Sequence, residues 1–122
     1  MYKFAKNLDL SKFIGRDLNQ ICVGKYDVQI HFASDVSISL QSRATVLHDG
    51  KAVATWDEKD GWSSTDYQKL LNQTVNSAVV ASESMLEIVL SDHWQLQLFD
   101  ESDQYESMTL CGLYDDGQIV IV

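Results

Sequence analysis

The sequence predicts a mainly β fold: an antiparallel β-sandwich or half-barrel of about eight to ten strands, with one or two short helices. Three observations support this prediction. Apolar and polar residues alternate in several segments, two Asp-Gly pairs mark tight turns, and the same order of segments occurs twice along the 122 residues. Two similar repeats therefore form a single domain spanning residues 1–122.

The first repeat is expected at about residues 18–56. In "VQIHFASDVSISLQ" (28–41), Val28 and Ile30 share one strand face, and a second alternating run follows the Ser-Asp pair at 34–35. A period of two residues indicates half-buried antiparallel strands. The Asp-Gly pair at 49–50 predicts a hairpin, because both central residues of a type I′ turn need positive φ. Before these strands, residues 9–14 predict a short helix that Gly15 can end.

The second repeat is expected at about residues 71–122, after a linker at 57–70. Here "LEIVLSDHWQLQLF" (86–99) alternates, pauses at a Ser-Asp pair and alternates again, before an Asp-Gly pair at 116–117. The tripeptide "LNQ" precedes both patterns, at 18–20 and 71–73. In residues 62–71, Ser63 and Asp66 predict the start of a second short helix. The terminal "IVIV" is expected inside a sheet, because an unpaired apolar strand would aggregate.

Charge is distributed unevenly between the halves. Residues 1–50 carry six Lys/Arg and five Asp/Glu, whereas residues 51–122 carry three and thirteen, and the net charge is −9. Phosphate binding needs clustered bases, so this balance argues against nucleic acid and against an anionic membrane surface. A basic protein partner is the natural complement.

The acids concentrate in two segments, "WDEKDGW" (56–62) and "FDESDQYES" (99–107). The interval between the Ser-Asp pair and the Asp-Gly pair is ten residues longer in repeat two than in repeat one, and the second segment falls in this extra length. No Lys or Arg follows Lys69. We therefore expect these acids to be dispensable for folding, to lie at one end of the sheets together, and to contact a partner. Aromatic residues beside charges are typical of interface anchors. The predicted partner-binding residues are Asp100, Glu101, Asp103, Tyr105, Glu106, Asp57, Glu58, Asp60, Trp56 and Trp62. A merely solvated acidic surface is the alternative.

The sequence offers no recognisable catalytic or metal motif. His31, His48 and His93 lack metal-ligand spacing, and the acidic segment lacks the spacing of a calcium loop. Cys22 and Cys111 are expected to be buried thiols in a reducing compartment, with a disulfide as the alternative. We expect no cofactor and no metal. We also expect a cytoplasmic location, because no segment has the features of a signal peptide or a membrane span.

A family resemblance adds a functional expectation. "FIGRDLNQI" (13–21), the alternation that ends in Ser-Asp, and "LQLFDESDQYESMTL" (96–110) resemble a group of small β-rich bacterial proteins, some encoded beside polymorphic toxins. In size and acidity the chain is similar to immunity proteins of contact-dependent growth inhibition systems. Over residues 13–122, the resemblance implies a non-enzymatic inhibitor that binds a basic toxin, often a nuclease. An adaptor or chaperone for a secreted effector is the alternative, followed by a hydrolase.

Overall fold

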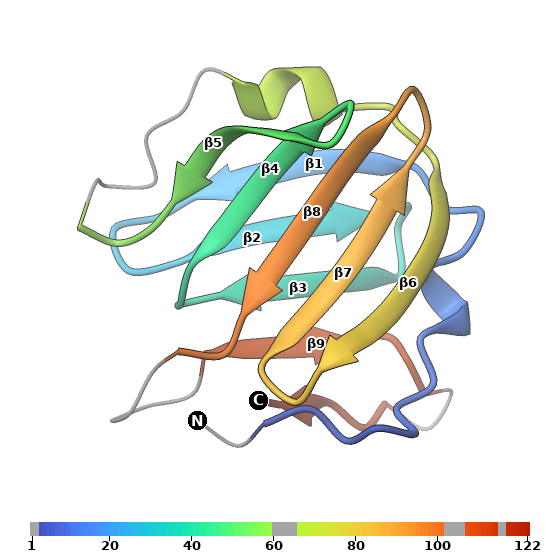
Figure 1. Ribbon diagram of the computed structural model, residues 1–122. Coiled ribbons are helices and arrows are strands. Elements are labelled where there is room, and N and C mark those ends of the chain that lie inside the picture. Colours follow the sequence, from blue (N-terminus) through green and yellow to red (C-terminus); the bar gives the residue numbers. More distant parts are fainter. Residues whose placement is uncertain (1–2, 60–65, 102–106, 115–116) are drawn as a thin grey trace.

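The protein is a sandwich of two antiparallel five-stranded sheets, which confirms the predicted fold class (Figure 1). The computed structural model describes residues 3–59, 66–101, 107–114 and 117–122. Its strands are β1 (Leu18–Val23), β2 (Val28–Phe32), β3 (Val36–Leu40), β4 (Ala44–His48), β5 (Lys51–Trp56), β6 (Val75–Ser82), β7 (Met85–Leu90), β8 (Trp94–Phe99), β9 (Met108–Cys111) and β10 (Val120–Ile121). The first sheet has the order β1-β2-β3-β9-β10 and the second β5-β4-β8-β7-β6.

The two halves of the chain have the same strand order. Strands β1, β2 and β3 lie in the first sheet, and β4 and β5 cross to the second. Strands β6, β7 and β8 lie in the second sheet, and β9 and β10 cross back to the first. Each sheet thus contains three strands of one half and two of the other, as expected for repeats related by a pseudo-twofold axis.

Details of the strand pairing support this relation. Strand β1 skips Asn19 where it pairs with β2, and β6 skips Asn76 where it pairs with β7. The segments that enter β1 and β6 also bind each other reciprocally. Gly15 N donates to Val75 O over 2.9 Å, and Asn72 N donates to Leu18 O over 2.7 Å. An antiparallel bridge between residues 17 and 74 lies at this crossing.

The correspondence begins before the first strand of each half. A short 3-10 helix, η1 (Ser11–Phe13), precedes β1, and η2 (Asp66–Leu70) precedes β6. These are the two helices expected from the sequence, although Ser63 lies outside the described residues. The repeated "LNQ" is not part of the structural match. Its first copy begins β1, whereas its second copy ends before β6 and corresponds to residues 14–16.

The core lies between the sheets and follows the predicted alternation. Ile30, Ile38, Ile88 and Leu96 are fully buried at the centre of β2, β3, β7 and β8. Burial of each such side chain contributes roughly 1.5–3 kcal/mol relative to exposure. Trp94 at the start of β8 is also buried.

Three local expectations have different outcomes. Asp49 and Gly50 both have positive φ, 53° and 80°, which confirms the predicted tight turn. Two residues of the terminal "IVIV" form β10, which lies at the edge of its sheet rather than inside it, because β9 is its one neighbour among the described strands. The prediction of buried thiols was wrong. Cys22 and Cys111 are half-buried free thiols, and β2 and β3 lie between the strands that carry them.

Candidate functional site

Two acid-bearing segments meet at one end of the second sheet. The connection between β3 and β4, the residues after β5 and the start of the β8–β9 connection enclose an open hollow of about 440 Å³. Its lining residues are Gln41, Ser42, Arg43, Asp57, Glu58, Lys59 and Glu101. We call these seven residues the charged groove. Their convergence confirms the expectation that residues after β5 and after β8 lie together.

Arg43, from the first half of the chain, forms an ion pair with an acid of the second half. The sequence around that acid contains no base and did not indicate this pair. Arg43 Nε donates to both carboxylate oxygens of Glu101, over 3.1 and 3.2 Å, and its Nη2 donates to Glu101 Oε1 over 2.6 Å. The guanidinium carbon lies 4.0 Å from the centre of the Phe99 ring. Glu101 is therefore one half of a bidentate ion pair rather than an uncompensated acid.

Strand register explains why these distant residues meet. Strands β4 and β8 are antiparallel neighbours, with Ala44 opposite Leu98. One residue further, Phe99 N donates to Arg43 O over 2.9 Å, which brings Arg43, a lining residue of the groove, next to Phe99. The hydrogen bonds to Glu101 raise the pKa of the Arg43 guanidinium, and the charges of Glu101 and Asp57 act in the same direction. Arg43 thus remains a fixed positive charge within an acidic rim.

Asp100 does not belong to this exposed rim, so its predicted role as a partner contact is wrong. The residue is only 2% exposed. Lys3 N donates to its Oδ2 over 2.8 Å, and the Ser107 hydroxyl donates to its Oδ1. The carboxylate ties the N-terminal segment to both ends of the β8–β9 connection. This burial and these partners argue against the expectation that Asp100 is dispensable for folding, because buried carboxylates are normally held by hydrogen bonds that the fold supplies.

Trp56 is the second predicted contact that the structure places in the core. Its side chain is 1% exposed at the end of β5, opposite Ala44 on β4. Glu58 and Glu101 are exposed and Asp57 is half-buried, so these three acids reach the protein surface. The remaining predicted contacts, Asp60, Trp62, Asp103, Tyr105 and Glu106, lie outside the described residues.

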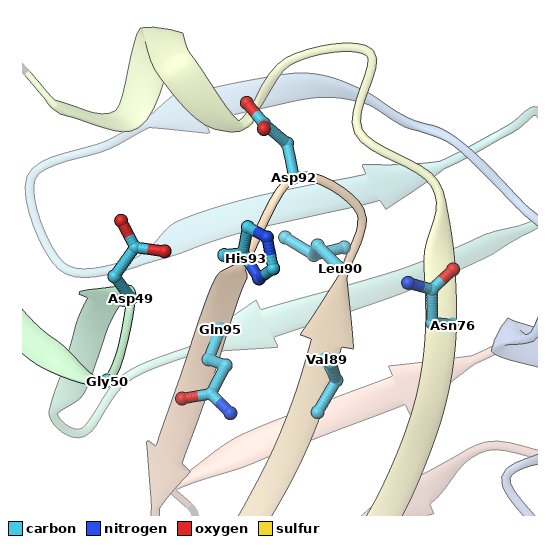
Figure 2. Close-up of a pocket in the computed structure, with 8 residues that line it drawn as sticks. All are labelled: Asp49, Gly50, Asn76, Val89, Leu90, Asp92, His93 and Gln95. Carbon is cyan, nitrogen blue, oxygen red and sulfur yellow. The ribbon is translucent and has the colours of Figure 1, made fainter.

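A second open hollow, of about 490 Å³, lies at the opposite end of the second sheet (Figure 2). It is formed by the β4–β5 and β7–β8 turns, and its polar lining residues include Asn76, Asp92 and His93. Beside it, His48 stacks on Trp94 with ring centres 4.1 Å apart, and its Nε2 lies 3.1 Å from Asp92 O. This packing gives His48 a structural role.

The sequence predicted an interruption at the Ser-Asp pair 91–92, but not the left-handed backbone of Asp92 and His93. Both residues have positive φ, 57° and 65°, and Trp94 N donates to Ser91 O across them. These features define a type I′ turn in which histidine occupies a position that glycine usually fills. Within the described residues, no group of three His, Cys, Asp or Glu side chains could hold a metal ion.

No family model, curated protein or solved structure matches the chain. Among the described residues, none of the helices is long and apolar enough to cross a membrane.

Proposed function

We propose that this chain is an immunity protein that neutralises a basic toxin domain, such as a nuclease, by stoichiometric binding at the charged groove. The observation that carries the proposal is the convergence of Asp57, Glu58 and Glu101, from segments far apart in sequence, on one open hollow. This acidic rim belongs to the half of the chain that holds thirteen of the eighteen acids.

Electrostatic steering supplies the mechanism. A net charge of −9 attracts a cationic partner over a distance, and the acids of the rim orient it during the encounter. A standard protein interface buries about 1,600 Å² in total. Such an interface extends beyond the groove itself and excludes substrate from a catalytic cleft.

The positions of the histidines favour binding over catalysis. His48 and His93 lie at the turns beside the second hollow, and His31 lies on the outer face of β2. None of these imidazoles lines the charged groove, so it lacks the neutral general base that a hydrolase most often uses. The free thiols of Cys22 and Cys111 are compatible with a reducing cytoplasm.

We call the product of the gene next to this one the toxin candidate, and the decisive experiment is its co-expression with this protein. We expect cells that produce both proteins to grow, and the purified proteins to form a one-to-one complex. A matched strain should carry a variant with Asp57→Asn, Glu58→Gln and Glu101→Gln, which is expected to protect less well. Cells that die as fast with this protein as without it would refute the proposed function.

A further inference from the structure

The surroundings of Arg43 have the chemistry of an arginine receptor. Glu101 supplies a carboxylate in bidentate geometry, and the Phe99 ring supplies a face 4.0 Å from the guanidinium carbon. The Thr45 hydroxyl lies 3.4 Å from Arg43 Nη1 as a third, weaker partner. A planar guanidinium suits this combination, whereas the ammonium group of lysine can neither pair bidentately nor stack flat on a ring.

Arg43 is bound to Glu101 weakly enough for another guanidinium group to replace it. The Arg43 and Glu101 side chains are 37% and 46% exposed, respectively. Ion pairs that are this accessible to water gain little net stability, because solvent and salt screen them. Replacing one guanidinium by another also preserves every hydrogen bond to Glu101, so no buried charge is left unpaired during the exchange.

The groove gives an incoming side chain direct access. Arg43 and Glu101 both line the open hollow, together with Asp57 and Glu58. Asp57 and Glu58 add two carboxylates to this lining and Lys59 adds one ammonium group, so acids still outnumber bases around the pair. The released Arg43 side chain can then remain near Asp57, whose charge it already senses.

We propose that Glu101, Phe99 and Thr45 form a guanidinium site that Arg43 fills in the free protein, and that an arginine of the partner displaces Arg43 on binding. This inference rests on the proposed function for the existence of a basic partner, and specifies that the partner presents arginine rather than lysine. Arg43 acts as an internal competitor that lowers affinity for partners without a well-placed arginine.

A second ion pair of the protein supplies a natural control. Arg16 makes a similar bidentate pair with Asp35, over 2.8 and 2.7 Å. Within the described chain, however, no aromatic ring lies over the Arg16 guanidinium. The two ion pairs therefore separate the effect of a carboxylate alone from the effect of a carboxylate beside a ring.

The test uses the isolated protein and Nα-acetyl-arginine amide as the probe, with Nα-acetyl-lysine amide at the same concentrations. Binding is followed by NMR shifts of the Phe99 ring and the Glu101 side chain. We expect Arg43→Ala to bind the arginine probe about fivefold more tightly than the natural protein, which corresponds to about 1 kcal/mol. Binding of the lysine probe should change less than threefold, and Arg16→Ala should gain no comparable binding at Asp35.

Three results would overturn the proposal: equal arginine affinity in Arg43→Ala and the natural protein, equal gains for both probes, or unchanged binding when Glu101→Gln is added to Arg43→Ala. Arg43→Gln serves as a second variant if Arg43→Ala does not fold, with the same expected gain. Because no toxin is present, the outcome is independent of the co-expression experiment. A failed protection assay with a positive titration would leave the arginine site standing and remove only its assigned partner.

Discussion

Adjacent acids can have opposite roles, as Asp100 and Glu101 show. Asp100 is buried and accepts hydrogen bonds from the N-terminal segment and from Ser107, whereas Glu101 faces the groove and pairs with Arg43. The local sequence presents both residues as members of one charged block. Burial separates them, because only a carboxylate with dedicated donors is tolerated inside a protein.

Replacing each acid by its amide should reveal this difference. Asp100→Asn keeps the side-chain volume but loses the charge that the Lys3 amide and the Ser107 hydroxyl stabilise. We expect the free energy of unfolding to fall by about 1–3 kcal/mol for Asp100→Asn. For Glu101→Gln we expect a decrease of less than about 1 kcal/mol, because the pair with Arg43 is exposed. Urea unfolding of both variants measures the two values, and equal losses would contradict these assignments.

The exposed pair between Arg16 and Asp35 predicts a pH dependence. Hydrogen bonds from Arg16 lower the pKa of the Asp35 carboxyl below its ordinary value of 3.8. A carboxyl whose pKa is lowered on folding stabilises the protein above its unfolded pKa, and this contribution is lost as pH falls through the folded pKa. The stability advantage of the natural protein over Asp35→Asn should therefore be constant above about pH 5 and vanish in acid. Thermal unfolding from about pH 2 to 7 tests this.

Arg16→Gln removes the same ion pair from its other side and is the matched variant. Its stability difference from the natural protein should show the same loss in acid. Curves for the natural protein and Asp35→Asn that stay parallel through the whole pH range would contradict the assignment.

At the scale of single elements, strands with two-sided alternation were predictable from sequence and irregular elements were not. Strands β2, β3, β7 and β8 alternate without interruption, because each has one face in the core and one outside. Strands β1 and β6 contain bulges, which shift the alternation partway along the strand. The edge position of β10 depends on which strand pairs with β9, and local sequence does not encode that choice.

The end of β9 shows how equivalent elements diverge. Gly112 follows β9 with φ +88°, and a Cβ atom there would overlap the backbone carbonyl oxygen of Asp35. The position equivalent to Gly112 in the other half is His48, the last residue of β4, whose ring stacks on Trp94. At one of these two equivalent positions, the backbones of Gly112 and Asp35 therefore lie in direct contact. At the other, the rings of His48 and Trp94 stack on each other.

Substitution of Gly112 should consequently be severe. We expect Gly112→Ala to lower the free energy of unfolding by more than about 2 kcal/mol, because it combines backbone strain with a steric overlap. Gly50→Ala is the control, since Gly50 also has positive φ, +80°, but its Cβ would meet no atom within 4 Å. It should cost about 1–2 kcal/mol from strain alone. Equal losses in urea unfolding would show that the overlap is relieved by backbone movement.

For the whole molecule, the exchange of strands between the halves makes them interdependent. Strand β4 of the first half pairs with β8, and β9 of the second half pairs with β3. A half expressed alone would expose both of these strand edges and much of the core. We expect fragments 1–62 and 63–122 to lack cooperative thermal transitions separately and to regain one when mixed. A fragment that folds alone would contradict this interdependence.

The candidate site was predictable only as far as charge composition allows. Net charge and the two acidic segments follow directly from sequence, and their placement at one end follows from strand count. The pair between Arg43 and Glu101 could not be predicted, because it depends on the register between β4 and β8. Asp100 and Trp56 were misassigned for a related reason: polarity or proximity to charge does not report burial.

The final prediction tests whether partner binding depends on the acids of the charged groove or only on the net charge of the protein. The variant with Asp57→Asn and Glu58→Gln removes two charges from the groove. The variant with Asp49→Asn and Asp92→Asn removes two charges beside the second hollow, at the opposite end of the same sheet. Asparagine also suits the left-handed backbone at both control positions, where φ is 53° and 57°. Both variants therefore have the same net charge and undisturbed turns.

Association with the toxin candidate should distinguish the two variants. We expect the groove variant to associate about three- to tenfold more slowly at low salt, with a flatter dependence on ionic strength, because rim charges act mainly on encounter. At 0.1 M salt the control variant should remain within about twofold of the natural protein, since charges at the far end are then screened beyond a Debye length of about 10 Å. Stopped-flow association at two salt concentrations measures both effects. Equal slowing of the two variants would mean that net charge alone attracts the partner, and that it docks elsewhere than the charged groove.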